Sequence, residues 1–232
     1  MKTRLEKAHQ HFRSCLSYSK RHRNIPTEFR KMKLYYGVNA CSLAVLITAL
    51  EADIPVELVK VDIYHSPHTT PDGSDYSEVN PKLNVPILEF SDGRRLSEVA
   101  VQLQYLADQE PGYGLAPDRL SDERYRLQEW LNYISSELHK SFSPWLFHSE
   151  VGRPAQEAAR NKIAFRLRLV EERLRDHQYL MGGYTIADAY LFTILAWSAF
   201  AKVPLDEFPS IRTWQARVGT RPAVVEALRR HV

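Results

Sequence analysis

The spacing of hydrophobic residues changes along this chain, and the change divides it into two parts. From Met32 to about residue 109, short apolar runs of strand length alternate with stretches of helical spacing. From residue 118 onward, hydrophobic residues recur only every three or four positions, as on the buried face of a helix. We therefore predict a small α/β domain over residues 32–109, a linker over 110–117 and an all-helical domain over 118–232.

The α/β part begins with the pattern of a βαβ unit. Met32–Tyr36 has the β-favouring aromatic residues of a strand. A helix with one apolar face follows from Cys41 to about Ala52, and Pro55–Val61 alternates as a second strand. Residues 64–79 are rich in His, Ser, Thr, Pro and Asp, so we expect a long polar loop with one helical turn near Tyr76, of the kind that often carries binding residues.

The stretch from Asn80 to Asp108 then predicts strand, turn, strand and helix in that order. Pro86–Phe90 is a short apolar run whose proline is tolerated at the first position of a strand. Asp92-Gly93 supplies the positive φ that a hairpin turn needs, and Arg94–Leu96 forms the returning strand. A helical pattern follows Glu98.

A helix start at Glu98 has a chemical consequence. The first turn of a helix presents N–H groups without internal partners, which favour a ligand carboxylate, while Glu98 itself would pair with a ligand amine. The two groups together describe an α-amino acid, and the backbone of Val85, especially with a cis Val85-Pro86 bond, would bind an extended peptide. The alternative is that Ser97-Glu98 only caps the helix.

Beyond the linker, every segment predicts a helix. Residues 127–138 and 163–174 each have one apolar face, and Gly182-Gly183 ends the second helix. Thr185–Asp188 matches a capping box that opens an apolar helix over 189–200. In this position Asp188 satisfies backbone donors, so we assign it a structural role. Two short helices follow, around Trp214 and Val225.

Charge is distributed unevenly along the 232 residues. The net charge is +3, but residues 1–31 contain nine basic and two acidic side chains, which leaves 22 basic and 26 acidic residues elsewhere. The mildly acidic remainder gives no reason to expect a nucleic-acid partner. We expect residues 1–31 to be a disordered or weakly helical extension: a start placed upstream of Met32, a targeting peptide or a nucleic-acid arm.

Other classes of protein are excluded by what the sequence lacks. Cys15 and Cys41 lie far apart and predict no disulfide scaffold, so a reducing compartment, the cytoplasm, is expected. No apolar run approaches the ~18 residues of a membrane-spanning helix, and no secretory signal is apparent. We expect no metal site.

Two residues are candidates for chemistry. Cys41 stands at a predicted helix start, where the helix dipole lowers a thiol pKa and favours an attacking thiolate; the alternative is a small buried apolar residue. His139 follows the apolar face of residues 127–138, where a histidine is either structural or a proton donor.

Three motifs resemble those of the glutathione transferases, and of the bacterial beta class in particular. They are the loop 36–42 (YGVNACS), the stretch 136–144 (SELHKSFSP) and the run 80–108 with its Val-Pro and Ser-Glu pairs. The resemblance covers nearly all of residues 32–230. It implies a thioredoxin-like N-terminal domain followed by an all-α C-terminal domain, with glutathione as co-substrate.

The resemblance also implies roles for individual residues. The γ-glutamyl end of glutathione would lie at Glu98 and Val99, its backbone along Val85, and its sulfur beside Cys41 and His139. His139 would donate to that sulfur or share a proton with Cys41. The implied accessory residues are Lys140 for positive potential, Asn132 reaching across a homodimer to the partner's glutathione, and Phe142 and Trp145 lining an apolar cleft.

We therefore expect a cytoplasmic homodimeric enzyme of detoxification that conjugates glutathione to hydrophobic electrophiles, with thiol-disulfide exchange through Cys41. The alternative is a binding or regulatory protein that keeps the fold without the chemistry. Departures from the family pattern favour this alternative, and they are Leu46, Ser66, Leu83 and Val99.

Overall fold

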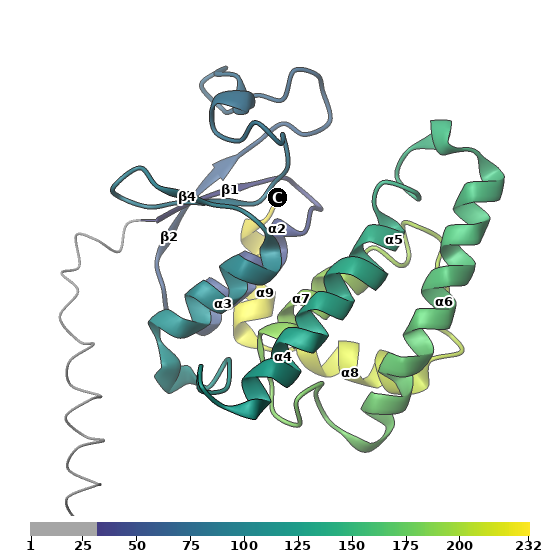
Figure 1. Ribbon diagram of the computed structural model, residues 1–232. Coiled ribbons are helices and arrows are strands. Elements are labelled where there is room, and N and C mark those ends of the chain that lie inside the picture. Colours follow the sequence, from purple (N-terminus) through teal and green to yellow (C-terminus); the bar gives the residue numbers. More distant parts are fainter. Residues whose placement is uncertain (1–31) are drawn as a thin grey trace, which may run out of the picture.

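The computed structural model describes residues 32–232, so the predictions for residues 1–31 lie outside the described range. The N-terminal part contains a four-stranded sheet of order β2-β1-β3-β4. Strand β1 (Met32–Tyr36) pairs in parallel with β2 (Val56–Lys60) and antiparallel with β3 (Ile87–Glu89). Strand β4 (Arg95–Leu96) completes the hairpin with β3. The predicted βαβ unit and the strand-turn-strand motif are thus confirmed (Figure 1).

Two helices of the N-terminal part pack beside the sheet. They are α2 (Ser42–Glu51) and α3 (Val99–Gln109), which contact each other. Helix α2 also packs against α7 and α9 of the C-terminal part, so eight of its ten residues are buried. The prediction of a single apolar face was therefore wrong for α2, because neighbours surround this helix. The polar loop after β2 contains the expected turn, a 3-10 helix at Tyr76–Glu78.

The C-terminal part is helical throughout its regular structure (Figure 1). Helix α7 (Ile186–Leu195) is its centre, and all ten of its residues are buried. The long α6 (Arg153–Asp176) buries Ile163, Leu167, Val170 and Leu174, as its pattern predicts. The remaining elements are α4 (Asp122–Tyr133), α5 (Lys140–Phe142), α8 (Pro209–Gly219), α9 (Pro222–Arg230) and the 3-10 turns Pro111–Tyr113 and Ser149–Val151.

Two helix ends differ from the sequence prediction. Helix α6 ends at Asp176, before Gly182, because the backbone of His177 is extended with φ −133° and ψ 141°. Gly182 instead occupies a later turn with φ 87°. Helix α7 ends at Leu195, short of the predicted residue 200.

The predicted helix over residues 127–138 is not a continuous α-helix. Residues Ile134–His139 form a π-helix between α4 and α5. A π-helix bonds each N–H to the carbonyl five residues back and therefore turns more slowly than an α-helix. The seven-residue spacing from Asn132 to His139 no longer equals two turns. Asn132 is exposed whereas His139 is mostly buried, so the two side chains do not share a face.

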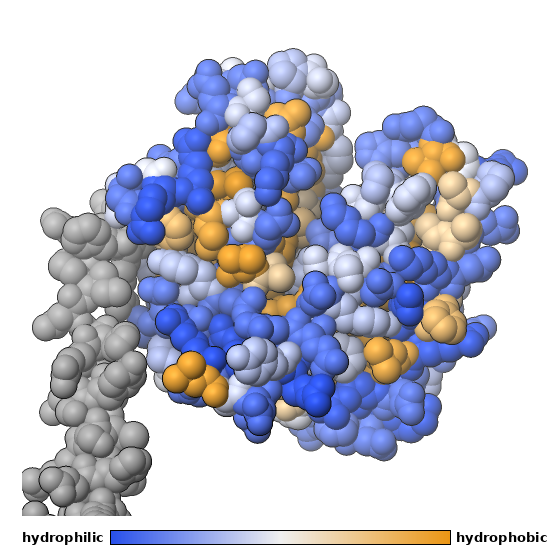
Figure 2. All heavy atoms as spheres, in the orientation of Figure 1, coloured by the Kyte–Doolittle hydropathy of each residue, from blue (hydrophilic) through white to orange (hydrophobic). Residues whose placement is uncertain are grey.

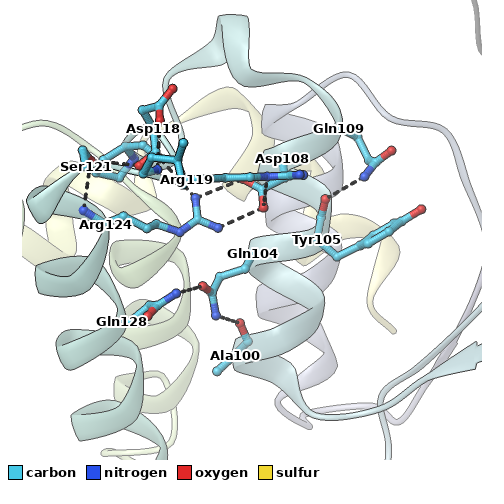
Figure 3. A network of polar contacts seen from close by, with 12 residues as sticks. Ala100, Gln104, Tyr105, Asp108, Gln109, Asp118, Arg119, Ser121, Arg124 and Gln128 are labelled. Carbon is cyan, nitrogen blue, oxygen red and sulfur yellow. Dashed lines mark hydrogen bonds and ion pairs between the residues drawn. The ribbon is translucent and has the colours of Figure 1, made fainter. Parts of the chain in front are cut away.

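Charged and polar side chains join the two parts of the chain at the start of α4 (Figure 3). Arg124 of α4 is buried and donates two hydrogen bonds, of 3.0 and 2.9 Å, to the carboxylate of Asp108 in α3. Arg119 lies 2.9 Å from the same carboxylate. Gln128 donates to Gln104 on the neighbouring turn. Fork-shaped Arg–carboxylate pairing fixes orientation as well as distance, so α3 and α4 meet at a defined angle.

The capping box predicted at Thr185–Asp188 is present. The Asp188 carboxylate accepts hydrogen bonds from Thr185 N at 3.0 Å, Leu180 N at 3.1 Å and Trp214 Nε1 at 2.9 Å. Burial raises the pKa of Asp188, and these hydrogen bonds lower it in part. Asp188 therefore ties three segments together and has the structural role predicted.

Within the part of the chain that the structure describes, no helix has the length and apolar character needed to cross a membrane.

Candidate functional site

The loop between β1 and α2 delivers Cys41 to one end of the sheet. A Cβ at Gly37 would lie 2.6 Å from Ile63 Cδ1, so a larger residue at this position would require the Ile63 side chain to shift. Asn39 follows with a left-handed φ of 57°, which asparagine tolerates better than most residues. Its carbonyl accepts a 2.8 Å hydrogen bond from the indole N–H of Trp197, which follows α7. The loop that precedes Cys41 is thus held from the helical part.

Cys41 is the N-terminal capping residue of α2, and its Sγ lies 3.5 Å from the carbonyl oxygen of Val85. Burial raises the pKa of Cys41 to about 12, while the charge of Lys140 lowers it and that of Glu98 raises it. The prediction of a lowered thiol pKa at the helix start is therefore wrong for this structure. The free energy needed to remove a thiolate from water exceeds the stabilisation that the helix dipole and the charge of Lys140 provide.

Val85 lies opposite Cys41, immediately before β3. The Val85-Pro86 peptide bond is cis, the conformation considered in the sequence analysis. The Val85 carbonyl faces the thiol of Cys41. Among the described residues, the N–H of Val85 has no hydrogen-bond partner. This N–H is available to an extended ligand.

The residue that precedes α3, Glu98, is exposed to solvent. Glu98 precedes the helix with φ 69°, and its side chain makes no capping hydrogen bond. Within the described chain, the N–H groups of Val99 and Ala100 have no partner. Instead of capping the helix, the Glu98 carboxylate pairs with Lys82 Nζ at 3.0 Å, and Lys82 also reaches Ser97 Oγ at 3.4 Å. Open N–H groups at a helix N-terminus bind anions, so the geometry disfavours a purely capping role.

His139 is the last residue of the π-helix and lies beside α7. Its Nδ1 is 2.7 Å from the hydroxyl of Tyr190, and its ring packs edge-on against Trp197 with centroids 5.2 Å apart. Burial lowers the pKa of His139 to about 4, with a further lowering by Lys140. A thiol of raised pKa and an imidazole of lowered pKa do not exchange a proton near neutral pH. The two pKa shifts thus disfavour a proton-sharing pair of His139 and Cys41.

The structure brings most of the predicted residues together. The charges of Glu98 and Lys140 act on the pKa values of both Cys41 and His139, so all four residues lie in one electrostatic environment. Val99 begins the helix that follows Glu98. Asn132 is separate: it lines a shallow groove on the outer face of α4 together with Tyr125, Arg126, Gln128 and Glu129.

Sequence reasoning missed two aromatic residues of the site. Tyr190 and Trp197 stand in the run read as a buried helix, but each has a polar atom directed at the site. Buried Tyr and Trp usually find partners for their polar atoms, and this was the available signal. Phe142 is fully buried against Trp197, so the prediction that it lines a cleft is wrong; Trp145 is 45% exposed.

The other departures from the family pattern fall in different places. Leu46 is buried in the core of α2, while Ser66 and Leu83 are exposed on the loops beside the site. Among the described residues, no cluster of His, Cys and acidic side chains has the arrangement of a metal site.

Two family models match this chain. "Glutathione S-transferase, N-terminal domain" matches residues 40–109, and "Glutathione S-transferase, C-terminal domain" matches residues 122–222. Glutathione S-transferase GstA of Escherichia coli O157:H7 is 41% identical over 198 residues, which cover 85% of this chain and 97% of the relative.

Solved structures agree with these matches. The chain superimposes on the ternary complex of BphK, a bacterial GST, with a TM-score of 0.83 and 48% identity over 86% of this chain and 98% of that one. It also superimposes on a sphingomonad glutathione S-transferase complexed with glutathione, with a TM-score of 0.81, 35% identity and the same coverage.

Proposed function

Because the chain belongs to the glutathione S-transferase family, we propose that this site binds glutathione and transfers it to hydrophobic electrophiles. Residues 32–109 hold the tripeptide, and residues 118–232 supply His139, Lys140 and one wall of the electrophile cleft. The residues between them, 110–117, form the linker.

The γ-glutamyl end of glutathione binds at the open start of α3. Its α-carboxylate accepts hydrogen bonds from the N–H groups of Val99 and Ala100, which have no partner in the described part of the chain. Its α-ammonium pairs with Glu98. The cysteinyl backbone lies along Val85, whose free N–H donates to the ligand carbonyl, as in strand addition.

Lys82 has a part in this recognition that the sequence motifs do not indicate. Its ammonium lies 3.0 Å from the carboxylate of Glu98. An arriving α-ammonium takes its place, and Lys82 is then free to pair with the ligand's α-carboxylate at the neighbouring N–H groups. One ion pair is exchanged for two, which favours a zwitterionic α-amino acid over a simple acid or amine.

The glutathione sulfur lies between Cys41 and His139. Burial raises the pKa of Tyr190, so its hydroxyl stays protonated, and we assign this hydroxyl as the donor to His139 Nδ1. The imidazole proton then sits on Nε2, the tautomer that donates to a thiolate. With Lys140 as a nearby positive charge, the thiolate of glutathione is stabilised.

In conjugation, the thiolate attacks the electrophilic carbon. A carbon–sulfur bond forms, and the leaving group departs with the electron pair of the bond that breaks. In thiol-disulfide exchange, the Cys41 thiolate attacks the glutathionyl sulfur of a mixed disulfide and the substrate thiolate leaves; a glutathione thiolate then attacks the Cys41–glutathione disulfide, which forms glutathione disulfide and frees the Cys41 thiolate. The raised pKa of Cys41 makes exchange the slower of the two reactions at neutral pH.

The electrophile lies in the hollow between the two lobes of the molecule (Figure 2). A row of aromatic rings leads from the site toward the surface of the helical lobe. Trp197 packs against Phe147 with centroids 5.2 Å apart, and Phe147 packs against Phe200 at 5.8 Å. Phe200 is 76% exposed, so its ring is accessible to an apolar ligand.

The finer assignments follow the same family. We propose a bacterial beta-class enzyme of detoxification that works in the cytoplasm, where Cys41 stays reduced. Asn132 is exposed on the outer face of α4, away from the chain's own site, which supports a two-fold homodimer in which it reaches the partner's glutathione.

The observation that carries this proposal is that Cys41 Sγ lies 3.5 Å from Val85 O, where the N–H groups of Val85 and Val99 have no partner among residues 32–232. Calorimetric titration with glutathione tests it. Glu98→Gln should weaken binding by more than tenfold, because it removes the charge that pairs with the ligand amine.

A matched control comes from Glu226, another surface carboxylate paired with a basic side chain. Glu226→Gln should bind glutathione as the wild type does. Equal affinities for the Glu98→Gln variant and the wild type would contradict the proposed site.

A further inference from the structure

We infer that His231 positions the loop that carries Cys41. His231 is near the C-terminal end of the sequence, far along the chain from the strands of the sheet. The residues after α9 return to the N-terminal part and lie beside β1 and the start of α2 (Figure 1). There His231 Nε2 lies 2.9 Å from Ser42 Oγ, across 189 residues of sequence. His231 is only 6% exposed and Ser42 is fully buried.

Ser42 is the residue next to Cys41, and its hydroxyl closes the loop 37–42. The N–H of Gly37 donates to Ser42 Oγ at 3.3 Å, and Ser42 Oγ donates to the carbonyl of Gly37, also at 3.3 Å. The N–H of Ala40 donates to the same carbonyl at 3.2 Å. The orientation of this one hydroxyl therefore decides how tightly the loop is held.

The hydrogen-bonding capacity of Ser42 determines what His231 contributes. A hydroxyl has one proton and two acceptor positions. Gly37 O takes the proton and Gly37 N fills one acceptor position, so the second is filled by a proton on His231 Nε2. Burial lowers the pKa of His231 to about 4, which keeps the ring neutral. The contact with Ser42 then requires the single ring proton on Nε2. With His231 in place, the hydroxyl of Ser42 has all three partners.

Two further contacts hold His231 in position. Its ring packs against that of Tyr36 with centroids 5.0 Å apart, and Tyr36 OH donates to the carbonyl of Val232 at 3.0 Å. Tyr36 is the last residue of β1, directly before the loop. His231 therefore fixes the loop at both ends, through Tyr36 and Ser42, and with it the depth at which Cys41 is buried.

The reactivity of the Cys41 thiol tests this inference, which rests on the role proposed for Cys41 but is measured without glutathione. Purified full-length protein is treated with iodoacetamide, and alkylation of Cys41 is followed by mass spectrometry in a Cys15→Ser background. His231→Ala should accelerate alkylation about tenfold, as expected when a buried hydrogen bond that holds the loop is lost. Ser42→Ala should have a similar effect, and the double variant should react no faster than either single one.

The conservative variant separates positioning from mere packing. In His231→Gln, the side-chain amide N–H takes the place of Nε2–H, so alkylation should return to within about threefold of the wild-type rate, well short of the tenfold change expected for a lost buried hydrogen bond. In the conjugation assay, His231→Ala should raise the KM for glutathione more than it lowers kcat, because the loop forms one side of the binding groove.

Arg221→Ala is the matched control. Arg221 lies just before α9 and forms a two-bond ion pair, of 2.6 and 2.8 Å, with Glu51 at the far end of α2. Its loss loosens the same two helices without touching Ser42, so Cys41 should react at the wild-type rate. Equal acceleration by Arg221→Ala, or none by both His231→Ala and Ser42→Ala, would overturn the inference. A failure of glutathione binding alone would leave it intact.

Discussion

The starts of helices α3 and α7 have similar sequences but differ in whether the chain's own side chains cap their N–H groups. Each has a hydroxyl or acidic residue before an apolar helix: Ser97-Glu98 before α3, and Thr185 with Asp188 at α7. At α7 the carboxylate of Asp188 is buried and takes four hydrogen bonds from its own chain. At α3 the carboxylate of Glu98 turns outward, and within the described chain the N–H groups of Val99 and Ala100 have no partner.

The comparison separates structural capping from binding. A helix start that satisfies its own N–H groups contributes to stability and has nothing left for a ligand. A helix start with unpaired N–H groups forgoes that stability and gains an anion site. The surroundings make the difference: α7 is enclosed by other helices, whereas the start of α3 lies at the edge of the N-terminal part.

The largest expected effect is on the closed helix start. Asp188→Ala should lower the free energy of unfolding by about 3–5 kcal/mol, because Thr185 N, Leu180 N and Trp214 Nε1 lose a buried acceptor together. Urea unfolding followed by tryptophan fluorescence measures the loss. The remaining folded protein should bind glutathione normally, and a loss below about 1 kcal/mol would show that the network is not a structural one.

His139, which lies beside α7, should make the free energy of unfolding depend on pH. The pKa of His139 is lowered to about 4 in the folded protein, so on acidification the unfolded chain takes up a proton first. Stability is then complete above pH 6.5 and falls as the pH drops toward 4, by up to about 3 kcal/mol from this residue. Unfolding at pH 4.5 and pH 7 should differ less in His139→Gln. Since the pKa of His231 is lowered in the same way, part of the slope should remain.

A substitution at the start of α3 should affect glutathione binding and leave stability nearly unchanged, the reverse of a substitution at Asp188. Glu98→Ala should cost about 1.5–3 kcal/mol of glutathione binding free energy, because a charged hydrogen bond to the ligand amine is lost. Its unfolding free energy should stay within about 0.5 kcal/mol of the wild type, since the side chain is 66% exposed and its pairing with Lys82 lies at the surface. A clear loss of stability would mean that Glu98 is a cap after all.

The smallest expected effects are the changes in stability on replacing the hydroxyl residue at each helix start, Thr185 or Ser97. Thr185→Ala should destabilise the protein by about 1 kcal/mol, the usual value for a capping residue. Ser97→Ala should cost almost nothing, because the Ser97 hydroxyl has only a 3.4 Å contact with the exposed Lys82. Thermal unfolding of both variants side by side measures the difference, and equal losses would remove the distinction between the two helix starts.

Much of the fold could be predicted because its signals are local. The βαβ unit, the hairpin at Asp92-Gly93 and the capping box each depend on residues a few positions apart, and all three are present. The same holds for the grouping of Cys41 with Val85, which follows from a strand-loop-helix pattern beside a hairpin. In such cases the chain's own chemistry leaves few alternatives.

The properties that matter for chemistry depended on contacts between distant segments. The position of Cys41 at a helix start follows from the sequence, but its raised pKa follows from burial. No local pattern pairs His139 with Tyr190, or Ser42 with His231. Nor did the periodicity reveal the π-helix that separates Asn132 from His139.

The sequence by itself thus determined which elements form and which residues face a common edge, because backbone geometry and side-chain spacing act over a few residues. Only the tertiary structure decided which of two similar helix starts is closed and which is open. It also decided whether a thiol is exposed or buried. Solvation and hydrogen bonding depend on all the segments that pack around a group, and these meet only in the folded chain.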